Sequence, residues 1–235
     1  MYRRDYIMRQ IEFMVEVMQR LGGLVDERRY QAAMTVIDES LEELFGLNGT
    51  LVTRLFGREP LSQLTFGEEA DLSQAKLIAA AALLQEAGDI QAEQGAEEAS
   101  FTAYASALEL LLTALLSHDG EALPEYAPDV EELTAVLAPF HLPRHLNQLL
   151  LRYYHQQSRY DLAENALFEM LEAEPEEASI LEQGITFYQL VLAESDLKLE
   201  MGNLPREEAE ASLAELLALR REVSFGHRRH RGKGV

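Results

Sequence analysis

The segment LNQLLLRYYHQQSRYDLAENALFEMLEAEP, residues 146–175, carries the clearest structural pattern in the chain. Apolar residues recur at three- and four-residue steps on both sides of a polar interruption at residues 156–159, and this spacing places side chains on one face of a helix. Pro175 ends the second run because proline donates no N–H and disfavours helix in the residue before it. Two amphipathic helices joined by so short a turn must lie antiparallel, so the segment predicts a helical hairpin.

The hairpin resembles the tetratricopeptide repeat, a helix–turn–helix motif with a period of about 34 residues. The residues that fit the motif are Leu150, Tyr154, Tyr160, Ala163, Leu167, Met170 and Pro175. Ser158 stands where the motif usually has glycine, and Asn147 stands where it usually has tryptophan, so the match is degenerate. The resemblance implies repeat-like stacking of hairpins. The alternative is an unrelated helical bundle in which the tyrosines are core residues.

The rest of the chain repeats this pattern loosely. Runs of β-branched residues bounded by turn signals are missing, so no sheet is expected. The sequence RYQAA at 29–33 parallels RYDLA at 159–163, which indicates a similar hairpin at the N-terminus. Besides the hairpin at 146–175, helices are predicted over residues 5–21, 28–45, 97–116, 129–137, 176–201 and 205–221, with one or two short helices around Pro60. Another helix starts near residue 68 and ends either at Gly88-Asp89 or at about Gln94.

These elements predict an all-α fold of stacked antiparallel helical hairpins, arranged as a tetratricopeptide-like repeat array or a bundle. Residues 1–223 are predicted to form a single repeat-like domain, which could divide near the loop at 117–128. Residues 224–235, SFGHRRHRGKGV, lack apolar periodicity and are predicted to form a basic flexible tail.

The first predicted helix is apolar on two faces. One stripe consists of Ile7, Ile11, Met14, Met18 and Leu21, and the other consists of Tyr6, Phe13 and Val17. A helix of this kind is covered on both sides. We therefore expect it to lie centrally in the fold or to contribute to an oligomer interface. Gly22 and Gly23 are expected to end it.

The composition narrows the function classes. The formal net charge is −21, which opposes binding to nucleic acid or to anionic membranes and leaves basic partners as a hypothesis. The chain has no cysteine, so disulfides, thiol catalysis and cysteine-ligated metals are excluded. The N-terminus has no apolar signal core, and the apolar runs fall short of the roughly 20 residues that a membrane span needs. We expect a cytoplasmic protein.

The motifs of common active sites are absent. The chain lacks the P-loop, the dinucleotide-binding glycines, the G-x-S-x-G elbow, H-E-x-x-H, the EF-hand and the Glu-x-x-His signature of di-iron bundles. His141 and His145 have the spacing of a metal pair, but Pro143 between them is expected to start a helix that leaves His141 outside. The glutamate runs at 93–98, 172–177 and 207–215 are interpreted as solvated helix faces. We expect no catalytic residues, metal or cofactor, and no enzymatic activity.

The most ligand-like cluster contains Arg152, Tyr153 and His155, which we single out as candidate partner-binding residues because tyrosine and arginine are favoured at binding hot spots. The leading hypothesis is a non-enzymatic helical-repeat protein that binds an unknown protein partner or its own copy. One alternative is a small-ligand-binding or enzymatic protein with a pocket between helices. Another is an RNA-associated protein that acts through the tail motif HRRHRGK, with nucleic-acid binding otherwise not expected.

The opening RRDYIMRQIEFMVEVMQRL and the following RRYQAAMTVIDESLEELFGL resemble an uncharacterised bacterial family, catalogued as a domain of unknown function. The match is best over residues 3–48. It is carried by Asp5, Tyr6, Ile7, Arg9, Gln10, Ile11 and Glu12. The resemblance implies a helical, tetratricopeptide-like fold with no established activity and no active-site residues.

Overall fold

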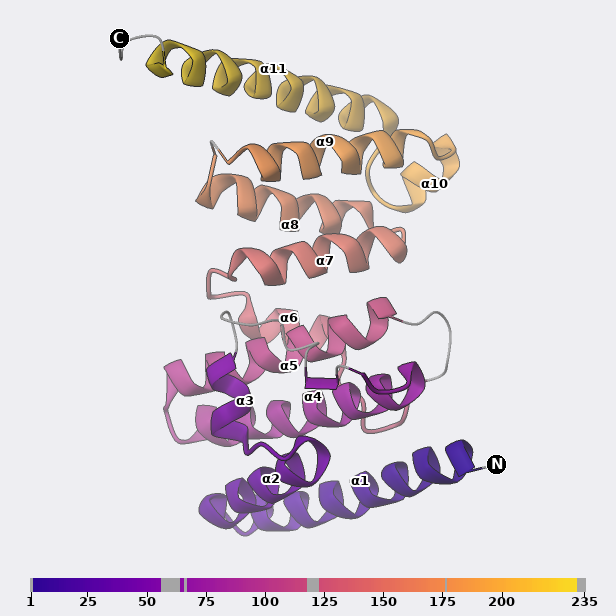
Figure 1. The fold of residues 1–235 in the computed structure, drawn as a ribbon, viewed down its shortest axis with the longest axis vertical. Coiled ribbons are helices and arrows are strands. Elements are labelled where there is room, and N and C mark those ends of the chain that lie inside the picture. The colour runs from indigo at the N-terminus through magenta and orange to yellow at the C-terminus, as the bar shows by residue number, and fades with distance from the viewer. Residues whose placement is uncertain (1, 56–63, 66, 118–122, 176, 232–235) are drawn as a thin grey trace. The chain divides into compact units, whose positions relative to one another are not determined.

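The computed structural model describes residues 2–55, 64–65, 67–117, 123–175 and 177–231, and no β-strand occurs within these ranges (Figure 1). The predicted all-α class is confirmed. The helices are α1 (Tyr2–Asp26), α2 (Tyr30–Phe45), α3 (Gly49–Leu55), α4 (Ala70–Glu93), α5 (Glu97–Ser117), α6 (Val130–Leu137), α7 (Arg144–Gln156), α8 (Tyr160–Ala173), α9 (Ala178–Leu192), α10 (Asp196–Met201) and α11 (Arg206–Arg231).

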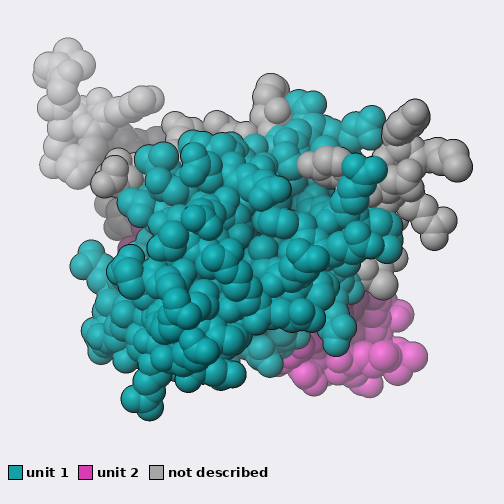
Figure 2. Space-filling view, turned by 90° about the horizontal axis from the view of Figure 1, so that it is seen from below, with its two compact units in different colours: residues 1–146 teal, residues 147–235 magenta. Residues whose placement is uncertain are grey.

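The chain forms two compact units, residues 1–146 and residues 147–235, which Figure 2 shows in different colours. The boundary between the units falls inside α7, whereas the sequence placed a subdivision near 117–128. Part of that predicted loop, residues 118–122, lies outside the described residues, as do residues 56–63 around Pro60.

The two hairpins that the sequence parallels, α1–α2 and α7–α8, have the same turn. Arg28 and Ser158 adopt left-handed φ values of 56° and 57°. In the first turn the Arg29 N–H donates to the Leu24 carbonyl, five positions earlier, at 2.8 Å, and the second turn has the equivalent bond. This closure satisfies the last carbonyls of a helix, and it usually employs glycine. The shared turn shows that the two hairpins are locally alike.

Unit 1 is organised around the antiparallel pair α4 and α5. The alanines at 79–82 are fully or almost fully buried, so α4 presents small side chains that allow close helix approach. Gly88 of α4 lies against the ring of Tyr104, and a Cβ at this position would come within 2.6 Å of Tyr104 Cε1. Helices α1 and α2 pack against α4 on the side away from α6 (Figure 1).

Among the described helices, α5 alone is long and apolar enough to cross a membrane by length and composition. Two thirds of its most apolar window (67%) is buried inside unit 1. The core helix of a folded domain passes the same test, so this is weak evidence for a membrane span.

Unit 2 is built from α8, α9 and α11, with Tyr160 and Tyr188 almost fully buried in its core. Two leucine side chains pack directly against Gly184 of α9. A Cβ at this position would lie 2.6 Å from a methyl of Leu216 and 3.0 Å from one of Leu167. The glycine therefore sets the close packing of α9 against α8 and α11.

The prediction of a single helix over 176–201 is wrong, because α9 ends at Leu192 and a separate helix, α10, begins at Asp196. The side chain of Ser195 caps α10 by accepting a hydrogen bond from the Lys198 N–H at 3.4 Å. The Arg206 guanidinium donates to the carbonyls of Leu192 and Glu194 at 2.9 and 2.8 Å. These carbonyls lie at and just beyond the end of α9, and the side chain of Arg206, the first residue of α11, satisfies them.

Two other helix ends differ from the prediction. Helix α1 continues through Gly22 and Gly23 to Asp26, because both glycines are exposed and their helical conformation costs only about 1 kcal/mol each. Helix α11 continues past the predicted end at Arg221 to Arg231, since nothing between these residues except Gly226 disfavours a helix. Residues 232–235 lie outside the described residues.

Candidate interaction site

The three predicted partner-binding residues all lie on α7, but they do not form one patch. Arg152 is exposed, whereas Tyr153 and His155 are partly buried. Successive residues of an α-helix are about 100° apart, so Tyr153 and His155 point about 160° away from each other. The structure brings Arg152 and His155 to neighbouring positions and separates Tyr153 from them.

His155 belongs to the packed interior of unit 2 more than to its surface. Its ring lies 5.9 Å from that of Tyr160 and 6.0 Å from that of Phe187, measured between centroids. Burial lowers the pKa of His155, the charge of Lys198 lowers it further, and Glu194 opposes both. The imidazole is therefore held neutral, which suits a packing role.

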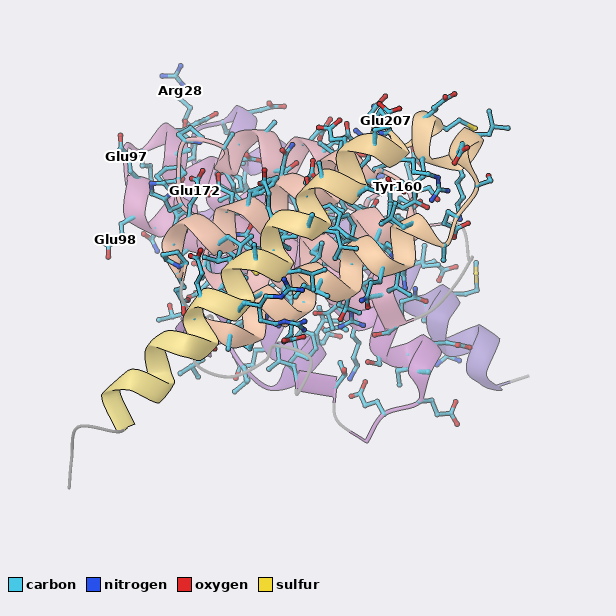
Figure 3. All side chains as sticks on the ribbon, turned by 90° about the horizontal axis from the view of Figure 1, so that it is seen from above. Arg28, Glu97, Glu98, Tyr160, Glu172 and Glu207 are labelled. Carbon is cyan, nitrogen blue, oxygen red and sulfur yellow. The ribbon has the colours of Figure 1, made fainter. Side chains whose placement is uncertain are left out.

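Helix α10 holds this end of unit 2 in place. The Asp161 N–H donates to the Gly202 carbonyl at 3.1 Å. A Cβ at Gly202 would lie 2.4 Å from Tyr160 Cδ2 and 2.6 Å from the Ser158 carbonyl oxygen. Tyr160 is labelled in Figure 3. Gly202, the residue after α10, therefore packs closely against the α7–α8 turn.

Three carboxylates that could supply acid–base chemistry, Glu109, Asp89 and Glu164, each contact a side chain of a neighbouring helix. Glu109 of α5 is 3% exposed, and its Oε2 lies 3.2 Å from Nε2 of His145. The Tyr104 hydroxyl donates to Asp89 at 2.6 Å. Burial raises the pKa of Asp89, and the hydrogen bond from Tyr104 partly offsets this. Sequence reasoning missed Glu109, although its position inside a leucine run is a signal for a buried partner.

A similar pair lies in unit 2, where the Tyr188 hydroxyl donates to Glu164 Oε1 at 2.6 Å and the Ser212 hydroxyl lies 3.4 Å from the same oxygen. Burial raises the pKa of Glu164 most strongly, and hydrogen bonds from Tyr188 and Ser212 lower it. The pair joins α8 to α9, and the serine adds α11. Its geometry indicates a structural bridge between helices.

The metal alternative at His141 and His145 is not supported by the geometry. Helix α7 begins at Arg144, so His145 lies in its first turn and His141 lies before it, as expected from Pro143. No group of three potential metal-ligating side chains occurs among the described residues. The glutamates of the three acidic runs that the structure describes are mostly exposed, as predicted.

An open hollow of about 520 Å³ lies in unit 1, where α4 turns into α5 beside α3. Its lining residues are Thr53, Gln91, Ala96, Glu97, Glu98, Ala99 and Thr102. The buried Oε1 of Gln91 has no hydrogen-bond partner. Glu97 and Glu98 are exposed, and Figure 3 shows both pointing outward. The hollow therefore lacks a buried carboxylate.

Helix α1 carries a row of apolar side chains that remain partly in solvent. Met14 and Leu21 are 0% exposed and face α2 and α4. On the adjoining face Met8 is 49% and Val15 43% exposed, and Ile11 between them and Met18 beyond them are partly exposed. The sequence analysis included Ile11 and Met18 but missed Met8 and Val15. We call Met8, Ile11, Val15 and Met18 the α1 stripe.

A smaller apolar surface lies on α10 of unit 2. Leu197 is 68% and Met201 77% exposed, and they lie one turn apart on a helix of six residues. Each is more exposed than any residue of the α1 stripe, but α10 has only six residues, so this surface is shorter than the α1 stripe.

Comparisons with curated proteins and with solved structures found no match. The sequence does match the pattern of a protein family, DUF6483, over residues 1–221. The match extends far beyond residues 3–48, where the resemblance was best, and it includes helices of both units. The chain therefore belongs to this family of unknown function.

Proposed function

We propose that this protein is a non-enzymatic helical scaffold that works by binding another protein chain, either a different protein or its own copy. The observation that carries the proposal is the α1 stripe, whose apolar side chains are left partly in solvent by the unit that α1 belongs to. Extended apolar patches are unusual on a monomer and often mark interaction sites.

The energetics favour contact through this stripe. Burying apolar surface contributes about 25 cal/mol per Å², so a half-exposed methionine or valine gains roughly 1 kcal/mol when a partner covers it. Two such residues, Met8 and Val15, together with the less exposed Ile11 and Met18, supply a directional surface along a rigid helix at little cost in backbone entropy. The partner residues proposed on α7 serve less well, because Tyr153 and His155 diverge and His155 is packed.

The arrangement of the carboxylates supports a binding role over an enzymatic one. Acid–base catalysis needs a titratable group that substrate can reach. Glu109, Asp89 and Glu164 are each occupied by a side chain of a neighbouring helix. The hollow beside α3 offers only exposed carboxylates. A small-ligand role is therefore the weaker proposal.

A tetratricopeptide-like stacking, a cytoplasmic location and a bacterial origin remain parts of this proposal. The shared turn of α1–α2 and α7–α8 supports the first. The strong negative charge agrees with a partner that is not a nucleic acid.

The test compares protein complexes recovered from the native cell with wild-type chain, with Val15→Glu and with Glu16→Gln. Val15 is part of the stripe, whereas Glu16 is exposed on the polar face of the same helix. We expect Val15→Glu to abolish a stoichiometric association, with a second copy or with another protein, that Glu16→Gln leaves intact. An association equally retained by all three chains, or none at all, would contradict the proposal.

A further inference from the structure

The apolar residues of the α1 stripe follow a repeat that is typical of helix pairing. The steps from Met8 to Ile11, Val15 and Met18 are three, four and three residues, and the same steps continue to Gly22 and Val25. This is the heptad spacing in which apolar side chains occupy the first and fourth positions. The seam is about two and a half heptads long, so it suits one straight partner helix of similar length.

Charge distinguishes α1 from the rest of the molecule. The helix contains four arginines and four acidic residues, so its formal net charge is zero, whereas the whole chain carries −21. Two copies of so acidic a protein repel each other over most of their surfaces. Along α1 this repulsion is weakest, and arginine and glutamate are interspersed on the polar face. A strongly basic partner would be attracted more strongly by the acidic surfaces of the rest of the chain than by α1, whose net charge is zero.

From the heptad spacing and the local neutrality we infer that the α1 stripe binds the α1 stripe of a second copy of this chain, with the two helices antiparallel. The inference rests on the proposed function and names its partner. Antiparallel helices oppose their macrodipoles, which parallel helices do not. In the antiparallel register Val15 packs beside Met18 of the second copy, Met8 lies beside Val25, and Glu12 lies beside the uncharged Gln19.

The size of the contact sets its strength. Helix α1 has 25 residues and is about 38 Å long, so a contact about 10 Å wide covers roughly 400 Å² on each copy. This lies below the roughly 800 Å² per partner of a stable complex, and it predicts a reversible dimer with a dissociation constant on the order of tens of micromolar.

The experiment is sedimentation velocity of the full-length chain over a concentration series from about 1 to about 300 μM, which brackets the expected constant. Wild type and Glu16→Gln should shift from monomer to dimer, and Val15→Glu should remain monomeric throughout. Circular dichroism should confirm that Val15→Glu stays folded, because the side chain is 43% exposed. A second substitution in the stripe, Met8→Lys, should give the same loss and guards against a folding defect of one variant.

The orientation is tested by disulfide trapping, which is clean because the chain has no cysteine of its own. One copy carries Met8→Cys, and a second copy of different size carries Val25→Cys. The disulfide between these two variants should form at least ten times faster than the disulfide between two copies of the same variant. Preferential pairing of Met8→Cys with itself would overturn the antiparallel arrangement. A wild type that stays monomeric at all concentrations, or a dimer that survives Val15→Glu, would overturn the inference. Val15-dependent retention of a different protein by a monomeric chain would overturn it and leave the proposed function standing.

Discussion

Replacing Tyr188 by Phe removes one hydroxyl from the interior of unit 2 and leaves the ring in place. The side chain is 0% exposed, and its hydroxyl donates to Glu164 at 2.6 Å. A hydrogen bond to a charged group contributes about 1.5–3 kcal/mol, and the Ser212 hydroxyl at 3.4 Å remains as a partial substitute. We therefore expect Tyr188→Phe to lower the free energy of unfolding by about 1–2 kcal/mol at pH 7.

The loss should depend on pH in a defined direction. Burial raises the pKa of Glu164 above its ordinary value of 4.5, and the Tyr188 hydrogen bond counteracts part of this. A carboxyl whose pKa is raised by folding contributes most to stability below its unfolded pKa, and this contribution is lost as pH rises through the folded pKa. Without the Tyr188 hydroxyl the folded pKa rises further. The variant should therefore lose more stability at pH 7 than at pH 4.

The assay is urea unfolding of wild type, Tyr188→Phe and Glu164→Gln at pH 4 and at pH 7. The quantity measured is the free energy of unfolding of unit 2. In Glu164→Gln the residue at 164 cannot titrate, so adding Tyr188→Phe to it should cost the same at pH 4 and pH 7. An equal cost of Tyr188→Phe at both pH values in the wild-type background, or a larger cost in acid, would refute the reasoning.

Three further predictions concern packing and buried charge. Gly202→Ala should destabilise unit 2 by about 1–3 kcal/mol, because its Cβ meets the Tyr160 ring and the Ser158 carbonyl. Gly23→Ala has nothing within 4 Å of its Cβ and should stabilise α1 by up to about 1 kcal/mol. Thermal unfolding of the two variants checks this, and equal shifts in melting temperature would count against the packing described. His145→Ala should lower the free energy of unfolding by about 2–4 kcal/mol, because it leaves the Glu109 carboxylate buried without the imidazole. Adding Glu109→Leu to the same chain should recover most of that loss in chemical denaturation. If it does not, the loss does not come from the His145–Glu109 pair. Because burial lowers the pKa of His155, its contribution to stability is present above the unfolded value of 6.5 and is lost as pH falls; an NMR titration should show the His155 ring titrating below 6.5, and a titration above that value would contradict its packed environment.

Local patterns in the sequence predicted most helices and the hairpin turns correctly. Apolar spacing and the RYQAA and RYDLA similarity led to hairpins that have the same left-handed turn residue. The break between α9 and α10 could not be predicted in this way, because the Arg206 side chain that satisfies the end of α9 comes from a later segment. Local periodicity does not report such distant partners.

The candidate site was harder to predict than the fold. Arg152, Tyr153 and His155 were chosen for residue type, and residue type says nothing about which of them a neighbouring helix covers. The α1 stripe was half recognised, since two apolar faces were identified on the first helix. Neither predicted face is the exposed one, because Met14, Leu21 and Val17 are buried, and Met8 and Val15 emerged only from the structure.

The account's central claim is that the α1 stripe is exposed on the single chain and covered when two copies meet. Three methionines of the chain report on this directly, because oxidation rate follows the exposure of the thioether. Met8 is 49% exposed on the stripe, Met201 is 77% exposed on α10, and Met14 is 0% exposed on the packed face of α1. Oxidation footprinting at about 1 μM and about 300 μM chain should show Met8 slowing several-fold at the higher concentration, Met201 unchanged and Met14 slow at both. Equal oxidation of Met8 at both concentrations would contradict the claim, as would a Met14 that reacts as fast as Met8.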